Sequence, residues 1–261
     1  MTDITFGVCV SPNFTENFLD NLVWSIVDQR WDNRVDNFEI ILVGGSPKIW
    51  RYKQEDSLVR IIDFDETIKP AWITKKKNVI GHAAKYNNIC LLHDYYELES
   101  GWLRGFKSIP DNWNILLNKV HTYEGYRHSD WLVHPDRMQE WIDNVPGVNE
   151  RLMKLAPHEN GPKFISGLPY STRDLTHVQY ISGGYVILKK EILEKVPMNE
   201  DLTWGQGEDI EWSNRLAKSG YLYNFNDDMH VICQKPGKWK LTIMTQDLVE
   251  DLRKYYGSRP V

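Results

Sequence analysis

Four short apolar runs in residues 1–100 constrain the fold of this chain more than any other feature. They are Ile4–Val10, Phe38–Val43, Val59–Phe64 and Ile89–Leu92. Apolar runs of this length, without polar residues at alternate positions, are typical of strands buried on both faces of a parallel sheet. Apolar residues also recur at helical spacing after Thr15, and a second helix is predicted over Val79–Lys85. The order β-α-β-β-α-β predicts an α/β fold with an open, mostly parallel Rossmann-like sheet flanked by helices.

The remaining sequence is expected to belong to the same single domain, 1–261, because no stretch of linker composition interrupts it. Residues 101–176 are irregular and rich in Trp, His and Pro, so we interpret them as an insertion, and we expect a small additional sheet. The later elements predicted are strand Tyr180–Leu188, helix Lys190–Lys195, a helix ending at Leu216, strand Tyr221–Phe225 and a tail helix, Gln246–Tyr256.

Composition excludes some classes of protein. The chain has a formal net charge of −5 and a pI of about 5.9, which argues against a general nucleic-acid-binding role. Cys9 and Cys90 lie in apolar runs and are expected to be small buried hydrophobes, as in a reducing compartment. No apolar stretch approaches the roughly 20 residues that span a bilayer, and Met1–Asp3 does not open a signal peptide. We therefore expect a soluble, cytoplasmic protein.

The segment Trp204–Trp212 is the most distinctive motif, with Glu208, Asp209 and Glu211 close behind two glycines. Crowded carboxylates repel one another, so one of them is expected to keep its proton to higher pH and to serve as a base for a hydroxyl. The alternative is structural, since acids in the first turn of a helix complement its dipole. Glu211 and Arg215 would form an i,i+4 pair on that helix. The spacing alone leaves both readings open.

Polar side chains follow the predicted strands, at the edge where parallel sheets bind ligands. They are Ser11, Asn13, Asp63, Asp65, His93 and Asp94. A carboxylate such as Asp94 can hold a divalent cation shared with phosphate oxygens, and His230 would add a nitrogen ligand, a mixture that suits manganese. The alternative for Asp94 is an ordinary surface turn, and we interpret Asp227 and Asp228 as turn formers.

Two further motifs indicate anion or ligand binding. Lys77–Asn78 is predicted to start a helix, and a helix N-terminus with a lysine favours anions, whereas Lys75 and Lys76 are interpreted as a solvated face. Ser182–Gly184 interrupts a predicted strand, which indicates either close approach of the backbone to a ligand or a β-bulge. No Walker sequence or Gly-x-Gly-x-x-Gly follows the first strand, which disfavours P-loop NTPases and nicotinamide dehydrogenases.

Taken in order, these motifs resemble those of the GT-A fold nucleotide-sugar glycosyltransferases, particularly the family-2-like group, from Ile4 to about Gln234. Trp204–Asp209 is similar to the Trp-Gly-x-Gly-Glu-Asp acceptor motif, and Ile181–Tyr185 is a second match. Lys77–Asn78, followed by a strand and an acidic turn, is similar to the family's Arg-Asn helix and Asp-x-Asp metal motif. The metal motif here is His93-Asp94-Tyr95, and Gly44–Gly45 stands where the family usually has aspartates that hold the base.

The resemblance implies a role for each matching residue. Asp209 would deprotonate the acceptor, Glu208 would position a sugar, and Asp94 and His230 would ligate the metal. Residues 1–100 would form the nucleotide-binding half and 101–261 the acceptor-binding half. Donor-binding residues would be Ser11, Asn13, Asp65, Lys77, Asn78, His93, Gly183 and Gly184, and acceptor-binding residues would be Trp204, Gly205 and Gly207.

The expected function is metal-dependent, inverting transfer of a sugar from a UDP- or GDP-sugar to a carbohydrate or other hydroxyl acceptor, with Mn²⁺ or Mg²⁺ as cofactor. We expect no nucleic-acid partner and no membrane-spanning segment. The alternatives are a non-catalytic module that binds sugars or nucleotide sugars, and a sugar nucleotidyltransferase. The latter usually carries a Gly- and Arg-rich loop after the first strand, where this chain has Ser11–Glu16.

Overall fold

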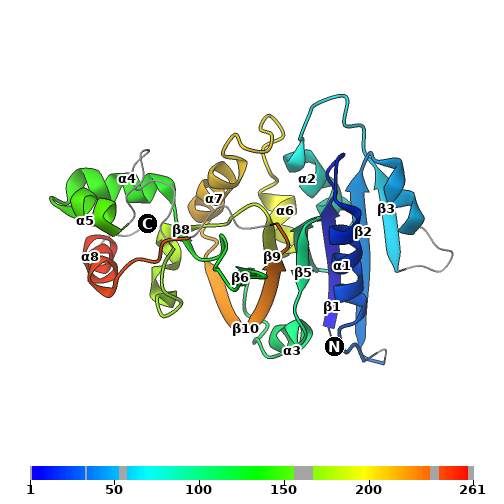
Figure 1. The fold of residues 1–261 in the computed structure, drawn as a ribbon, viewed down its shortest axis with the longest axis horizontal. Helices are drawn as coiled ribbons and strands as arrows, with labels where there is room; N and C mark the ends of the chain where they lie inside the picture. The colour runs from blue at the N-terminus through cyan, green and yellow to red at the C-terminus, as the bar shows by residue number, and fades with distance from the viewer. Residues whose placement is uncertain (1, 33, 53–57, 156–166, 236–240, 258–261) are drawn as a thin grey trace.

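An eight-stranded sheet forms the centre of the molecule (Figure 1). The computed structural model describes residues 2–32, 34–52, 58–155, 167–235 and 241–257. The sheet has the strand order β3-β2-β1-β4-β9-β6-β10-β5, and β7 and β8 form a small second sheet, as predicted. The strands are β1 (Thr2–Cys9), β2 (Asp36–Gly44), β3 (Val59–Asp63), β4 (Asn88–His93), β5 (Tyr96–Leu98), β6 (Ile115–Thr122), β7 (Leu132–Val133), β8 (Gln179–Tyr180), β9 (Tyr185–Lys189) and β10 (Tyr223–Cys233).

Helices cover the sheet, and some of them lie beyond one end of it. They are α1 (Glu16–Val27), α2 (Ile73–Ala83), α3 (Trp102–Lys107), α4 (Pro135–Asn144), α5 (Val148–Leu155), α6 (Lys190–Lys195), α7 (Glu208–Lys218) and α8 (Gln246–Tyr256), with 3₁₀ turns η1 (Pro47–Tyr52) and η3 (Arg173–Val178). In Figure 1, α4, α5 and α8 group together beyond the β10 side of the sheet. No helix in the described ranges has the length and apolar character to cross a bilayer.

The sheet is mostly parallel because its strands are buried on both faces. β1 pairs in parallel with β2 and β4, and β2 with β3, which confirms the predicted parallel half. Within β4, Ile89 and Leu91 pack into one apolar cluster, while Cys90 and Leu92 pack into the cluster that contains α1. Alternate residues of a strand point to opposite faces, so an unbroken apolar run fills both cores.

Several element predictions need correction. The region 101–176 is not only an insertion, because β6 is an interior strand of the main sheet. The predicted strand Tyr180–Leu188 is two strands in different sheets, separated at Ile181–Gly184. The strand predicted over Tyr221–Phe225 continues to Cys233, since the pairing of β10 with β6 resumes after an irregularity between Asn226 and His230. Asp227 and Asp228 therefore lie within that irregularity of a strand.

Candidate functional site

The candidate site lies at one edge of the main sheet. β1, β4, β6 and β10 run in the same direction, because β4 and β6 both pair antiparallel with β9 and β10 pairs in parallel with β6. The carboxyl ends of these strands therefore lie along the same edge of the sheet, the one formed by strand ends, and the antiparallel β9 begins there. Ser11, Asp94 and Lys235 follow β1, β4 and β10, and Gly184 precedes β9.

Asp94 is held against the end of β1. Its Oδ2 accepts a hydrogen bond of 2.6 Å from the Ser11 backbone N–H, and its side chain is buried. Burial raises the pKa of Asp94, and the Ser11 hydrogen bond opposes that rise. Asn13 is exposed in the segment between β1 and α1. The predicted pair Ser11 and Asp94 is thus brought together.

His93 ends β4 as a buried, neutral imidazole. Its backbone N–H donates to the Gly184 carbonyl at 3.0 Å, and its Nδ1 lies 2.9 Å from the Tyr95 hydroxyl. Burial, followed by the positive charges of Lys77, Lys235 and Lys76, holds the pKa of His93 well below its usual range. Its Nε2 is buried and has no hydrogen-bond partner among the described atoms.

Three lysines gather at this edge, and we call Lys76, Lys77 and Lys235 the cationic side of the site. The Lys76 ammonium donates to the Val10 carbonyl at 2.7 Å and pairs with Glu66. Lys77 is buried, and its ammonium donates to the Gly183 carbonyl. Lys235 is exposed and lies 3.6 Å from the centroid of the Tyr95 ring. The interpretation of Lys76 as part of a solvated face is wrong, because the side chain is only 3% exposed.

The position of α2 explains how two adjacent lysines are buried. Gly7 of β1 has no side chain, and a Cβ there would lie 2.1 Å from Ile80 Cγ2, so the helix approaches the sheet closely. Lys77 and Asn78 were predicted to start this helix. The helix instead begins at Ile73, so both residues lie inside it. The Asn78 side chain donates to the Met198 carbonyl and to Glu200, and it accepts from the Met198 N–H.

Gly183 and Gly184 join the cationic side to the other half of the site. The Gly183 carbonyl accepts a hydrogen bond from the Lys77 ammonium, and the Gly183 N–H donates to Asp209 Oδ2 at 3.0 Å. A Cβ on Gly184 would lie 2.4 Å from the Tyr96 hydroxyl, so that position has no room for a side chain. The pair lies in a turn ahead of β9, which is inconsistent with the alternative of a bulge within one strand.

Glu208 and Asp209 open α7, and we call them the acidic side of the site. Asp209 accepts the Ile210 N–H on Oδ1 in addition to Gly183 on Oδ2, so both of its oxygens are oriented by the backbone. Glu208 is buried and accepts the Gly205 N–H at 3.1 Å. Burial raises the pKa of Glu208, and the neighbouring charge of Asp209 adds to that rise.

The structural reading of the acidic motif is confirmed, and the role of one of its acids as a base stays a prediction. The three acids do lie in the first turn of α7, and Glu211 does pair with Arg215. The preceding residues Gly205 and Gly207 have positive φ values of 82° and 74°, a region that glycine enters without strain. Trp204 is 64% exposed beside them. Asp209 therefore lies at a helix N-terminus, and the loop that leads into this helix carries an exposed aromatic side chain.

Asp65, predicted to bind the donor, lies outside the contacts of the cationic side, whereas its neighbour Glu66 takes part in them. Asp65 is exposed, and its carboxylate accepts the Thr67 N–H and hydroxyl, so it closes its own turn. Glu66 reaches the site and pairs with Lys76. Gly45 permits this arrangement, because a Cβ there would lie 2.4 Å from the Phe64 carbonyl and 3.0 Å from Glu66 Cγ. Neither Glu66, at the end of the third predicted strand, nor Lys235 was predicted to be a site residue.

His230 does not join Asp94, which corrects its prediction as a metal ligand. Its Nδ1 lies 3.4 Å from Glu99, and its Nε2 is 3.0 Å from the Asp227 carbonyl. β10 and β5 are antiparallel, so His230 lies opposite Glu99. Tyr95, the neighbour of Asp94, pairs with Gln234, so at about 3.3 Å of rise per residue Glu99 lies roughly 13 Å from it along β5. His230 therefore faces a different part of the sheet.

The residues at this edge do not fit a resident divalent cation. Within the described ranges, no group of three or more His, Cys, Asp and Glu side chains is arranged to hold a metal. On the cationic side, Glu66 is already paired with Lys76, which leaves Asp94, among the described residues, as the one remaining carboxylate near the three ammonium groups. Those positive charges repel a cation. The prediction of a site made by Asp94 and His230 is not supported by this arrangement.

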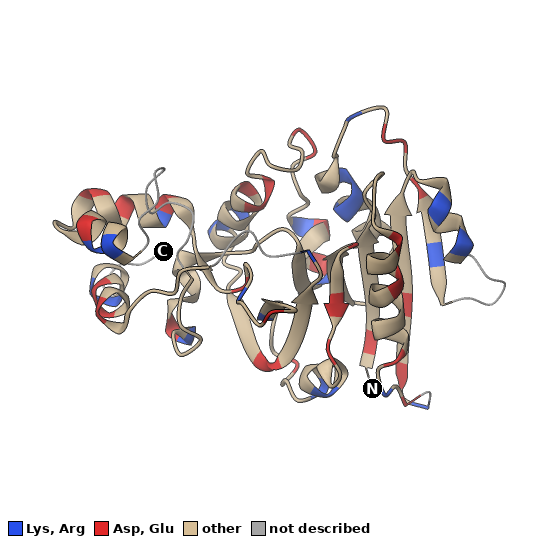
Figure 2. Cartoon of the chain, viewed as in Figure 1, with Lys and Arg blue, Asp and Glu red and all other residues tan. Residues whose placement is uncertain are grey.

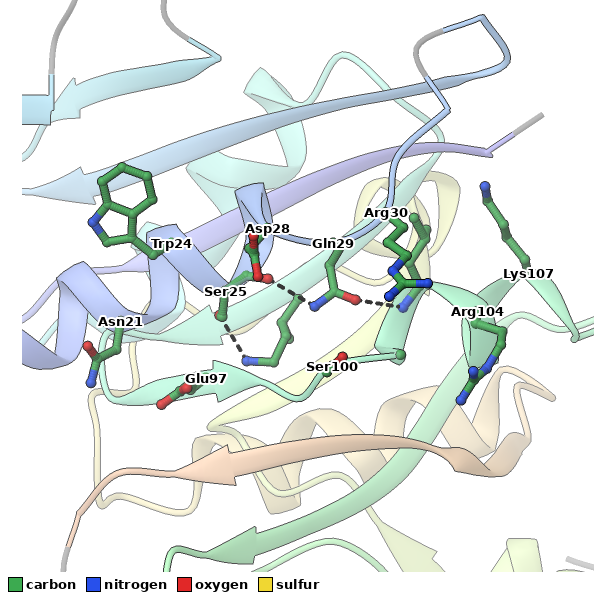
Figure 3. Close-up of a pocket in the computed structure, with 13 residues that line it drawn as sticks. Asn21, Trp24, Ser25, Asp28, Gln29, Arg30, Glu97, Ser100, Arg104 and Lys107 are labelled. Carbon is green, nitrogen blue, oxygen red and sulfur yellow. Dashed lines mark hydrogen bonds between the residues drawn. The ribbon is translucent and has the colours of Figure 1, made fainter.

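A cavity of about 990 Å³ lies elsewhere, between α1, β5 and α3 (Figure 3). Ser25 accepts the Leu98 N–H and Gln29 accepts the Leu103 N–H, which ties these elements together around it. None of the predicted site residues lines this cavity. The cavity and the candidate site are separate features of the molecule.

Comparison with known proteins identifies the fold of the chain. No protein-family profile matches the chain, and no curated protein matches it by sequence. Among solved structures, GalNAc-T7 with UDP, GalNAc and Mn²⁺ is similar with a TM-score of 0.58 and 15% identity, over 92% of this chain and 44% of that one. TarS of S. aureus with UDP-GlcNAc has a TM-score of 0.56 and 14% identity, over 97% and 65%.

A mannosyltransferase, PcManGT from Pyrobaculum calidifontis with GDP-Man and Mn²⁺, has a TM-score of 0.54 and 12% identity, over 91% and 58%. The chain thus spans between 44% and 65% of the length of these three proteins. Identities this low concern the fold alone. The curled, mostly parallel sheet, its flanking helices and the small second sheet show that the chain has the GT-A fold.

Proposed function

We propose that this chain is a glycosyltransferase that moves a sugar from a nucleoside-diphosphate sugar to a hydroxyl acceptor. The observation that carries the proposal is the Gly183–Gly184 turn. The Gly183 N–H donates to Asp209, and the Gly183 carbonyl accepts from Lys77. The Gly184 carbonyl accepts from the His93 N–H at the end of β4. A base, a buried cation and a strand end are thus adjacent in a fold shared with proteins solved with UDP, UDP-GlcNAc and GDP-Man.

The donor is proposed to lie on the cationic side. Lys77 is buried, and no ion pair to a carboxylate is found for it within the described ranges, so a bound diphosphate would supply the missing negative charge. Gly183 is half-buried beside the Lys77 ammonium, where its backbone would face the ligand, whereas Gly184 is buried. The unpartnered Nε2 of His93 is a further polar atom that a donor could satisfy. UDP- and GDP-sugars are the proposed donors.

The acceptor is proposed to lie on the acidic side. The Trp204 face is exposed, and the positive-φ positions 205 and 207 of the loop beside it carry no side chain. Asp209 would take the proton of the attacking hydroxyl as the oxygen bonds to the anomeric carbon. A base opposite the leaving group leads to inversion at that carbon.

The test combines binding with turnover. Purified protein is screened by thermal shift against UDP, GDP and dTDP, and then assayed for nucleoside-diphosphate release from the matching sugars with a panel of saccharide acceptors. We expect release with one donor class. Stabilisation by a nucleotide without turnover would favour the non-catalytic binding module. Formation of a nucleotide sugar from a sugar phosphate and a nucleoside triphosphate would favour the nucleotidyltransferase.

A further inference from the structure

The cationic side contains two ammonium groups for which the described residues show no ion pair. Lys76 is paired with Glu66, whereas Lys77 donates to a carbonyl and Lys235 lies over an aromatic ring. No ion pair from Lys77 or Lys235 to a carboxylate occurs in the part of the chain that the structure describes. The charge of Lys77 acts on Glu208 without forming an ion pair with it, and a buried ammonium is stabilised by a directly bound anion, so Lys77 favours an anionic ligand.

Lys235 is placed at this edge by the strand pairing. The Gln234 N–H donates to the Tyr95 carbonyl at 2.8 Å, which extends the β10–β5 pairing by one residue. The next residue, Lys235, therefore lies beside Asp94, and its ammonium is 3.6 Å from the Tyr95 ring centroid. Lys77 approaches from α2, on the Gly183 side. Figure 2 shows the blue of α2 near the red at the start of α7.

We propose that Lys77 and Lys235 neutralise the leaving nucleoside diphosphate, so that sugar transfer by this chain needs no divalent cation. This inference rests on the proposed glycosyltransferase function. The bond between the anomeric carbon and the diphosphate oxygen breaks, and its electron pair stays on that oxygen, beside the two ammonium groups. The acceptor oxygen bonds to the anomeric carbon and passes its proton to Asp209. Asp94, with one oxygen bound by the Ser11 N–H, accepts a donor hydroxyl through its other lone pairs.

Among the residues that the structure describes, no cation site fits, which agrees with this arrangement. An ion bridging Asp94 and the diphosphate would stand among the same ammonium groups and be repelled by them. Lysine is a compact charge with several donors, and it commonly binds phosphate in this way. The same charge neutralisation that a metal ion supplies in other enzymes is here provided by side chains.

The experiment uses protein dialysed against EDTA, with its metal content measured. UDP and GDP binding is followed by calorimetry, and donor turnover is followed with EDTA or with added Mn²⁺ or Mg²⁺. We expect nucleotide binding in EDTA and turnover within about twofold of the rate with added ion. Lys235→Met, at an exposed position, should weaken binding and slow turnover at least tenfold. Lys77→Met should do the same, but it removes a buried side chain, so its folding is checked by circular dichroism.

The control is Lys218→Met, an exposed lysine near the end of α7, which should match the wild type. Turnover that is lost in EDTA, restored by Mn²⁺ and then abolished by Asp94→Asn would overturn the inference. An unchanged Lys235→Met variant would also overturn it. Absence of turnover from every donor, with and without ions, would contradict the underlying glycosyltransferase function, and the inference would fall with it.

Discussion

The cationic and acidic sides of the site are built by different structural means. Lys76 and Lys77 are held inside α2, a regular helix packed closely on β1, and their ammonium groups are bonded to carbonyls. Glu208 and Asp209 sit at the start of α7, behind a loop with two positive-φ glycines. The first arrangement fixes charge in place, as binding a diphosphate requires. The second puts a carboxylate at an accessible helix terminus, as proton transfer requires.

Asp209→Asn should separate chemistry from binding and give the largest effect. An amide cannot accept the acceptor proton, so turnover should fall by about 10²–10⁴-fold, the usual contribution of a general base. Nucleotide affinity should stay within a few-fold, because the proposed donor site is the cationic side. Calorimetry and steady-state kinetics measure the two quantities.

Glu211→Gln is the matched control for Asp209→Asn, since Glu211 is on the same helix turn but pairs with Arg215. It should turn over donor at the wild-type rate. Full activity in Asp209→Asn would remove Asp209 from the reaction and leave its acid as a helix-capping residue.

Lys77→Met should affect binding and turnover together. A charge-assisted hydrogen bond contributes about 1.5–3 kcal/mol, so nucleotide affinity should fall roughly 10- to 150-fold. Lys75→Met is the comparison, because Lys75 is on the same helix but pairs with Glu200 at the surface. Equal nucleotide affinities in the two variants would show that the cationic side does not bind the donor.

Gly184→Ala tests the turn that joins the two sides. Its new methyl group would overlap the Tyr96 hydroxyl, whereas a Cβ at Gly183 has nearest neighbours at 3.2–3.5 Å. Overpacking of this kind costs about 1–3 kcal/mol, so the free energy of unfolding should drop by that amount in Gly184→Ala. Gly183→Ala should lose less stability but more activity, because its neighbours are Asp209 and Lys77. Urea denaturation and turnover assays distinguish the two variants.

The sequence predicted those parts of the fold that local patterns determine. The strands of the parallel half and the helices Lys190–Lys195 and Gln246–Tyr256 were found from apolar spacing. β6 was missed because polar Asn118 and Lys119 interrupt its apolar pattern, and its partners β9 and β10 are remote in sequence. The end of β10 was missed because the irregularity between Asn226 and His230 looks like a turn.

The site was predicted only in part for the same reason. Ser11, Asp94, Gly183 and Asp209 come together, as their motifs suggested. Lys235 was missed because its position depends on where β10 ends, and His230 was misplaced by the same error. The burial of Lys76 and Lys77 depends on Gly7 and the close approach of α2, which a charge run alone does not reveal.

Glu208→Gln should give the smallest effect, and it tests whether the buried carboxylate of Glu208 destabilises the fold. The folded-state pKa of Glu208 is raised, mainly by burial, so folding favours its protonated form. That contribution to stability is fully present below the pKa of an unfolded glutamate, about 4.3, and is lost as pH rises through the folded-state pKa. At pH 7 the ionised side chain therefore destabilises the fold, although a first-turn acid is normally favourable.

Glu208→Gln should consequently melt slightly higher than the wild type at pH 7, and the difference should shrink as pH falls toward about 4. Glu211→Gln should show no such gain at pH 7, because it loses the pair with Arg215. Thermal unfolding of all three proteins across this pH range measures the effect. A Glu208→Gln difference that stays constant with pH would mean that lost or gained contacts, and not the charge of a buried carboxylate, distinguish the acidic side from the cationic side.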